Sequence, residues 1–214
     1  MDAMLEASEP LRVILIGGSS HAGKSALAES LASRLGWEWL STDSLARHPG
    51  RPWKTLPQTV PEHVAEHYLS LSIDELINDV LRHYRSMWPN IEAIIASHAT
   101  DFSASQFILE GSALWPESVA TLDFDNVAAF WLTADDALFQ KRIHTESRFS
   151  EASAQGKIMI QKFLQRTLLY NEKMMDVINR LGFDYIEVDK ISSPDQLCDM
   201  CFELLQKHAA GFFR

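Results

Sequence analysis

Residues 17–25 read GGSSHAGKS, from Gly17 to Ser25, and the rest of the chain is interpreted outward from this stretch. From Gly18 onward it fits the pattern G-x-x-x-x-G-K-[ST], in which glycines let the backbone bend so that successive N–H groups point at a polyphosphate. Lys24 can reach the β- and γ-phosphates, and the hydroxyl of Ser25 can bind Mg²⁺. The stretch therefore predicts a nucleotide-phosphate site. The residues expected to contact the nucleotide are Gly18, Ser19, Ser20, His21, Ala22, Gly23, Lys24, Ser25 and Ala26.

The sequence on either side of this loop supports the same interpretation. The apolar run RVILI, residues 12–16, is typical of a short buried strand. After the loop, Leu27, Leu31 and Leu35 recur at helical spacing, and Gly36 is placed to end the helix. A strand before the loop and a helix after it are the context that the motif requires, and they favour it over an ordinary Gly-Ser turn in another α/β fold.

Composition limits the classes of function. The chain has 214 residues, 46% of them hydrophobic and 22% charged, which suits one domain with a sizeable core. A formal net charge of −10 argues against a nucleic-acid-binding surface, so a phosphate site must be a local basic pocket. Two cysteines make no disulfide framework, and no apolar run is long enough to span a membrane. No signal peptide is visible at the acidic start, so a cytoplasmic location is expected, and the oligomeric state stays open.

Hydrophobic periodicity predicts strands that alternate with helices. The expected strands are 12–17, 37–40, 107–111, 126–132 and 184–188. The expected helices are 24–35, one beginning near Ile73, a further one from Pro89 to about 102, and then 134–147, 155–181 and 194–207. This order predicts an α/β three-layer sandwich, with a five-stranded parallel sheet covered by helices on both faces. Residues 47–61, which contain four prolines, are expected to form a loop in an insert at 45–105.

Three further stretches complete a family resemblance. STDSLAR (41–47), ILEGSALWP (108–116) and LTADDALFQKRIHTESRF (132–149) follow the predicted phosphate loop in order. Together they resemble the small P-loop kinases, above all 2-phosphoglycerate kinases and chloramphenicol phosphotransferase-like enzymes, and more distantly nucleoside-monophosphate and shikimate kinases. The resemblance implies one P-loop kinase domain over 1–214, with a helical substrate insert at 45–105 and an arginine-bearing lid at 140–157.

The resemblance also implies an activity. Such a protein moves the γ-phosphoryl group of ATP, with Mg²⁺, to a hydroxyl or phosphate of a small-molecule acceptor, and it needs neither nucleic acid nor membrane. The sequence has no Asn-Lys-x-Asp guanine signature, which argues against a GTPase. An alternative remains open, because a phosphate loop alone does not make an enzyme: the protein could be a nucleotide-binding switch or adaptor with little turnover.

Two acidic residues lie where strands end. Asp43 follows the second strand, where the resemblance places a carboxylate that contacts the acceptor and takes its proton; the alternative is a helix cap. Glu110 ends the third strand, where P-loop proteins commonly have Asp. It is a candidate for Mg²⁺ binding together with Ser25, directly or through water, and for substrate contact, and the alternative is a solvated strand end.

Basic residues are the candidates for contacting phosphate and substrate. Planar guanidinium groups match the spread charge of a transferring phosphoryl group. The resemblance assigns this catalytic role to Arg142 and Arg148 of the lid, whereas the alternative is an exposed helix with salt bridges. Arg47 and Arg51 lie beside Asp43 and Arg166 lies one helix further on, so these three are candidates for gripping an anionic substrate.

Two other motifs have competing interpretations. His63, Glu66 and His67 fit H-x-x-E-H, a zinc peptidase signature, but no third ligand can be assigned from the sequence. We favour a helix over the substrate pocket, with His63 or His67 touching substrate. Cys198 and Cys201 fit C-x-x-C but share the apolar side of a late helix, which predicts reduced, packed core cysteines.

Overall fold

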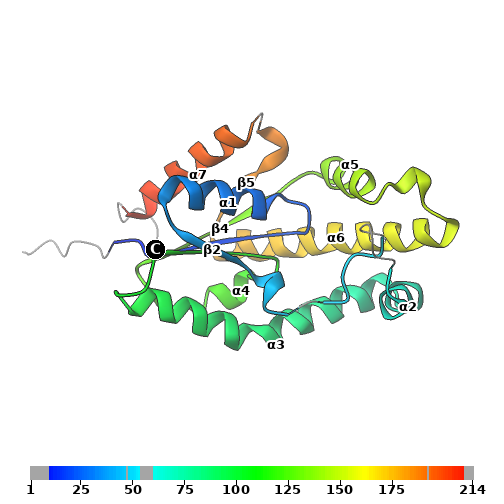
Figure 1. Ribbon diagram of the computed structural model, residues 1–214, viewed down its shortest axis with the longest axis horizontal. Coiled ribbons are helices and arrows are strands. Elements are labelled where there is room, and N and C mark those ends of the chain that lie inside the picture. Colours follow the sequence, from blue (N-terminus) through cyan, green and yellow to red (C-terminus); the bar gives the residue numbers. More distant parts are fainter. Residues whose placement is uncertain (1–9, 47, 54–59, 192, 210–214) are drawn as a thin grey trace, which may run out of the picture.

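A parallel β-sheet forms the middle layer of the protein (Figure 1). The computed structural model describes residues 10–46, 48–53, 60–191 and 193–209. Within these residues the sheet has five strands, in the order β2-β3-β1-β4-β5. Their bounds are β1 Val13–Gly18, β2 Glu38–Ser41, β3 Phe107–Glu110, β4 Val127–Thr133 and β5 Asp184–Glu187. The predicted α/β fold with a five-stranded parallel sheet is confirmed.

The central strand, β1, explains why the fold has three layers. All six of its residues are buried. Because successive side chains of a strand point to opposite faces, Ile14 and Ile16 pack into one apolar cluster, and Val13 and Leu15 pack into another. A strand that is apolar on both faces must be covered on both faces. The sequence RVILI therefore requires a helical layer on each side of the sheet.

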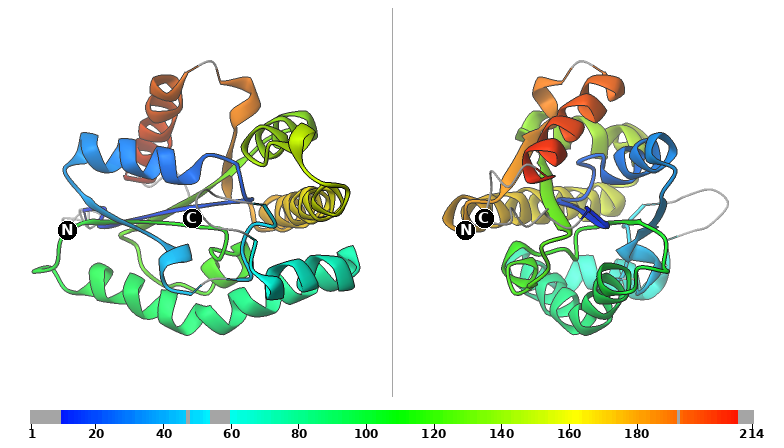
Figure 2. Two further views of the ribbon diagram at one scale, coloured as in Figure 1. Left: turned by 45° about the vertical axis from the view of Figure 1, so that its right-hand side comes forward. Right: turned by 90° about the vertical axis from the view of Figure 1, so that its left-hand side faces the viewer.

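Helices provide those two layers. On one face lie α1 (Lys24–Leu35) and α7 (Pro194–Ala209), and on the other lie α3 (Ile73–Thr100) and α4 (Pro116–Val119), as Figure 1 shows. The 28-residue helix α6 (Ala154–Leu181) extends beyond the sheet, with α5 (Asp136–Glu146) and α2 (Glu62–Ser70) on opposite sides of it (Figure 2). None of the helices in the described ranges is long and apolar enough to cross a membrane.

Helix α3 differs from the prediction. We expected a break at Pro89 and a separate helix after it, and this was wrong, because one helix runs from Ile73 to Thr100. Proline costs a helix one backbone hydrogen bond. Here its ring lies on the exposed side, while buried residues continue along the other side from Leu76 to Ala99. Burial along this continuous face outweighs the lost hydrogen bond. The other predicted helices and strands agree with the structure to within two residues.

The segment between β2 and β3 corresponds to the predicted insert. After β2 comes a short 3₁₀ turn, η1 (Thr42–Ser44), and then a loop whose described residues 48–53 pass close to α2. The hydroxyl of Tyr68 in α2 donates a hydrogen bond to the Gly50 carbonyl at 3.1 Å. From α6, Lys162 Nζ donates to the Leu71 carbonyl at 2.6 Å, just beyond the end of α2. These contacts hold the insert against α6, beside the carboxyl ends of the strands.

Candidate active site

The loop between β1 and α1 has the shape that binds phosphate. Gly18 has φ 138° and Gly23 has φ 102°, both in the region that favours glycine. A Cβ on Gly18 would also lie 2.5 Å from the Leu132 carbonyl oxygen of β4. Helix α1 begins directly after Gly23, so its first N–H groups and its positive end face the same point as the loop. These are the backbone features that a preformed anion site requires.

Lys24 is held inside this site. Its side chain is buried, and Nζ donates a hydrogen bond to the Ser19 carbonyl at 2.9 Å, across the loop. Burial lowers the pKa of Lys24, while the nearby charges of Glu110 and Asp43 oppose that shift. A buried ammonium group with two carboxylates close by is a combination that is typical of functional sites.

Ser25 and Glu110 form an oxygen pair beside Lys24. Ser25 Oγ donates to Glu110 Oε1 at 2.9 Å, and Glu110 is only 1% exposed. The strand register places Glu110 opposite Ile16 of β1 and Ser41 of β2, at the carboxyl edge of the sheet. Glu110 is therefore not a solvated strand end. A hydroxyl and a carboxylate are the hard oxygen ligands that suit Mg²⁺, so this pair fits the predicted ion.

Asp43 lies in η1, but it does not cap that turn. The side chain of Ser41 accepts a hydrogen bond from the Asp43 backbone N–H at 3.3 Å, so Ser41 is the N-cap. The cap alternative for the Asp43 side chain is therefore wrong. The exposed carboxylate instead lines two cavities at once.

These cavities differ in their linings. The first, of about 720 Å³, is lined by the loop between β1 and α1, by Glu110 and by α5, the helix of the predicted lid. The second, of about 460 Å³, is lined by insert residues and by Arg166 of α6. The residues that line both are Ser20, Asp43, Arg51 and Ser112. A third, smaller cavity of about 250 Å³ lies between α1 and α7, and its lining is largely apolar, including Leu27, Ile191 and Leu197.

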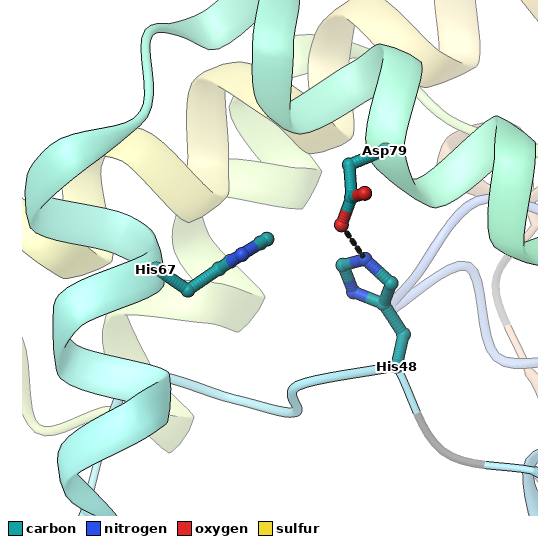
Figure 3. A group of neighbouring side chains, drawn as sticks. All are labelled: His48, His67 and Asp79. Atoms are coloured by element: carbon teal, nitrogen blue, oxygen red, sulfur yellow. Dashed lines mark hydrogen bonds and ion pairs between the residues drawn. The ribbon is translucent and has the colours of Figure 1, made fainter.

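Arg166 contributes a largely buried guanidinium group to the lining of the second cavity. It is 9% exposed, and its guanidinium carbon lies 4.7 Å from the ring centre of Phe163 and 5.6 Å from that of Tyr68. Within the described residues, Nη1 is buried and has no hydrogen-bond partner. A buried guanidinium group with a free donor is suited to an anionic ligand. On the insert side, His48 also lines this cavity, with His67 and Asp79 next to it (Figure 3).

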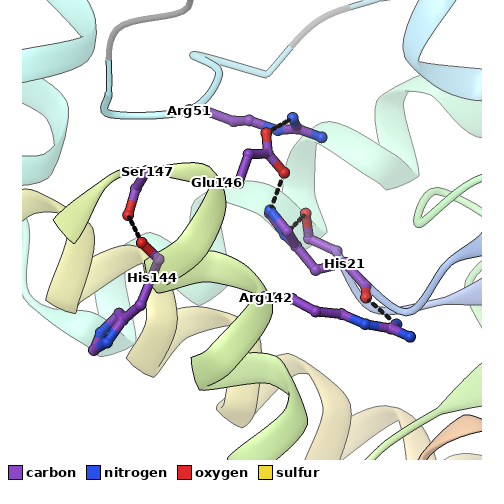
Figure 4. A network of polar contacts seen from close by, with 7 residues as sticks. His21, Arg51, Arg142, His144, Glu146 and Ser147 are labelled. Carbon is purple, nitrogen blue, oxygen red and sulfur yellow. Dashed lines mark hydrogen bonds and ion pairs between the residues drawn. The ribbon is translucent and has the colours of Figure 1, made fainter.

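The predicted lid contacts the phosphate loop. Arg142 Nη1 of α5 donates to the His21 carbonyl at 2.7 Å, and His21 Nε2 lies 2.9 Å from Glu146 Oε2 (Figure 4). Glu146 also pairs with Arg51 of the insert. Arg51 and Arg142 both line the first cavity. Residues of the phosphate loop, of α5 and of the loop after η1 thus meet in one polar network, and Arg142 bonds to the loop backbone rather than forming the salt bridge that was its alternative.

One predicted residue lies outside the cavities, and another falls outside the described residues. Arg148 is exposed, has φ 49°, and precedes the short turn η2 (Phe149–Glu151) without lining these cavities, so the structure does not bring it to the site. Arg47 lies outside the described residues. Sequence reasoning missed Ser112, although its place just beyond Glu110 at a strand end was an available signal. It also missed Tyr84, which lines the second cavity from α3.

Comparisons with known proteins agree with this geometry. No family model matches the chain, and no curated protein matches its sequence. Among solved structures, a gluconokinase from Sinorhizobium meliloti 1021 has a TM-score of 0.57 at 18% identity, covering 95% of this chain and 97% of that one. A shikimate kinase from Acinetobacter baumannii, in complex with shikimate, has a TM-score of 0.51 at 14% identity, covering 94% and 96%. A shikimate kinase from Aquifex aeolicus also has 0.51, at 11% identity, covering 93% and 99%. The chain therefore has the fold of the P-loop small-molecule kinases.

The burial of His21 predicts a pH-dependent stability. Burial lowers the pKa of His21 from 6.5 to about 4; the Glu146 carboxylate opposes this shift, and the Arg51 and Lys24 charges add to it. Between pH 6.5 and 4 the unfolded state binds the extra proton, so stability falls as the pH falls through this window. His21→Asn, which tolerates φ 67°, removes the effect. From pH 7 to pH 5, wild type should lose about 2 kcal/mol more than the variant in urea unfolding. An equal loss in both would contradict a buried neutral His21.

Proposed function

We propose that the protein is an ATP-dependent phosphotransferase that uses Mg²⁺ and moves the γ-phosphoryl group of ATP to a hydroxyl or phosphate group of a small molecule. The observation that carries this proposal is the junction of the first and second cavities at Asp43. A phosphate site on one side of a carboxylate and a separate polar cavity on the other is the arrangement that transfer between two bound molecules needs. A cytoplasmic location remains a prediction.

The first and third cavities supply the nucleotide site. The phosphates would lie on the loop N–H groups with Lys24 at the β- and γ-phosphates, and the base would lie in the third cavity beside Leu27 and Leu197. Ser25 and Glu110 would hold the Mg²⁺, which when bound neutralises phosphate charge. Arg142 already faces this cavity, so residues 140–157 would serve as the lid, closing over the nucleotide and excluding water.

We assign Asp43 as the group that takes the proton from the acceptor hydroxyl. In the transfer, the bond between the γ-phosphorus and its bridging oxygen to ADP breaks, and a bond from the acceptor oxygen to that phosphorus forms. The acceptor hydroxyl loses a proton, which the Asp43 carboxylate takes. Lys24 and Arg142 stabilise the negative charge on the transferring group. The exposure of Asp43 between the cavities supports this role, because the carboxylate is free to reach either ligand.

The second cavity favours a negatively charged acceptor. Arg166, whose guanidinium group is largely buried, lines this cavity, and Arg51 lies at its boundary with the first cavity. The neighbours of similar fold include a gluconokinase and a shikimate kinase bound to shikimate, a hydroxylated carboxylic acid. We therefore propose that the acceptor is a small hydroxylated acid, held by its carboxylate at Arg166 with a hydroxyl at Asp43.

Acceptor-dependent ATP consumption tests the proposal. The purified protein should hydrolyse ATP slowly alone and consume it rapidly when the right member of a panel of hydroxylated acids, sugars and nucleosides is added. Lys24→Ala should lower that turnover about 10²–10³-fold, the scale of losing a preorganised charge. If ATP binds but no acceptor raises its consumption, the switch or adaptor alternative replaces the enzyme.

The variant Asp43→Asn tests whether Asp43 accepts a proton or only fills space at the junction of the two cavities. Asparagine keeps the size of the side chain but cannot take the acceptor's proton, so kcat should fall about 10²–10⁴-fold. The Kd for ATP should change little, because the loop and Lys24 hold the phosphates. Ser44→Ala, in the same turn, is the matched control and should keep near-normal kcat. A weakened ATP affinity with unchanged kcat at saturation would instead give Asp43 a magnesium role.

Replacing Arg166 tests the acceptor's charge. Arg166→Met keeps much of the side-chain volume but removes the donor, and losing a charge-assisted hydrogen bond should raise the acceptor KM about 10–100-fold. The acceptor KM of Arg166→Lys should lie between those of the wild type and of Arg166→Met, because lysine keeps the charge without the planar fork. The KM for ATP should stay the same in both. A change confined to the ATP KM would mean that Arg166 serves the nucleotide.

A further inference from the structure

A cluster of metal-binding side chains lies beside the second cavity, outside the machinery assigned above. His48 comes from the loop after η1, His67 from α2 and Asp79 from α3, and Figure 3 shows the three converging. One ligand atom from each lies within 4.8 Å of the other two. His48 Nε2 and Asp79 Oδ2 are 3.0 Å apart. Three separate segments thus place two imidazoles and a carboxylate together.

The cluster includes one of the two histidines of the H-x-x-E-H motif. Its second histidine, His67, belongs to the cluster, whereas His63 is exposed. No third ligand could be assigned from the sequence because the partners, His48 and Asp79, come from segments before and after α2. The zinc peptidase interpretation is therefore not supported, since the motif's two histidines do not form a pair.

Two buried nitrogens in this region have no hydrogen-bond partner. Among the residues that the structure describes, His67 Nε2 and His83 Nε2 are both buried and unpaired. The His83 ring centre lies 5.4 Å from that of His48. Buried polar atoms are rarely left unpaired in proteins, and an unpaired imidazole beside a second imidazole and a carboxylate is suited to binding a cation.

We propose that His48, His67 and Asp79 bind one divalent transition-metal ion, of which zinc is the best match. Imidazole and carboxylate ligands are those of zinc sites, whereas Mg²⁺ prefers oxygen ligands alone. A tetrahedral zinc ion places its ligand atoms about 3.3 Å apart, so small side-chain rotations close the cluster. His83 lies near enough to be the candidate for the fourth ligand.

The charges around the cluster are compatible with a cation. Burial lowers the pKa of His48 to about 4, with Arg166 acting in the same direction, and burial also lowers the pKa of His67. A lowered pKa favours the neutral imidazole, which is the form that binds a metal ion. Arg166 repels a cation, but Asp79 supplies a negative charge in direct contact with His48.

The ion would act on the shape of the second cavity rather than on the chemistry. His48 lies two residues from Gly50 and three from Arg51, in the loop that also carries Trp53, and all four line the second cavity. Because His67 belongs to α2 and Asp79 to α3, one ion bound by all three side chains would fix the His48 loop to these two helices. This inference does not depend on the proposed transfer reaction, because metal binding is measured without nucleotide or acceptor.

Zinc titration of the full-length chain, without an affinity tag and stripped of metal by a chelator, tests the site. Zn²⁺ alone, in competition with a chromophoric chelator, should bind at one ion per chain with a submicromolar Kd. Because the ion binds the folded state, Tm should rise by about 5–10 °C when free Zn²⁺ is 100-fold above Kd. The absence of stoichiometric binding, or competition by Mg²⁺ at equal concentration, would overturn the proposal.

Matched variants locate the ion. His67→Gln, His48→Gln and Asp79→Asn should each weaken Zn²⁺ binding at least about 100-fold, more than the loss of a group that only supports a ligand. His63→Gln, one turn earlier on the same helix, should bind as wild type does. Tm in chelator shows which variants are folded, and any folded one of the three decides the result. Wild-type affinity in that variant, or lost affinity in His63→Gln, would overturn the assignment. In Co²⁺-loaded protein, the visible absorption should disappear or shift with His67→Gln.

Discussion

The tight backbone turn between β1 and α1 is the constraint on which the rest of this structure depends. The turn needs left-handed backbone at Gly18 and Gly23, and β4 leaves no space beside the loop, since a Cβ on Gly17 would lie 2.1 Å from Trp131 Nε1. The loop cannot shift without repacking the sheet. Its geometry is therefore set by the position of β1 between β3 and β4, and the same packing brings Glu110 to Ser25.

Helix α6 connects the phosphate loop to the rest of the site. Residues from its first half, such as Phe163, pack with residues of α2 and α5, whereas Tyr170 and Met174 pack in the core on the other face of the sheet. Between them, the Thr167 carbonyl accepts a hydrogen bond from Ser19 Oγ at 3.1 Å. Arg166 lies at this junction, so the charge that faces the second cavity is placed by both cores and by the loop together.

The distribution of charge follows from the same arrangement. The chain carries a net charge of −10, yet basic side chains line both main cavities. Lys24 and Arg142 line the first cavity, Arg166 lines the second, and Arg51 lines both. Two of them, Lys24 and Arg166, are more than nine-tenths buried. An acidic exterior disfavours polyanions such as nucleic acids, while partly desolvated cations inside a cavity interact strongly with a small anion that fits there. The selection of a small phosphate-bearing ligand that we propose would thus follow from burial rather than from overall charge.

The sequence by itself determined the features that short-range physics encodes. Apolar periodicity predicted the strands and most helices to within two residues, and glycine positions with Lys24 and Ser25 predicted the phosphate loop, because both depend on neighbouring residues. The tertiary structure alone decided that α3 continues through Pro89, where burial along a long face outweighs one hydrogen bond. It also decided that Arg166 faces the second cavity while Arg148 stays exposed, and that His48, His67 and Asp79 meet. Those outcomes depend on how separate segments cross and pack, and a local pattern of residue types carries no information about the distance between side chains on different elements.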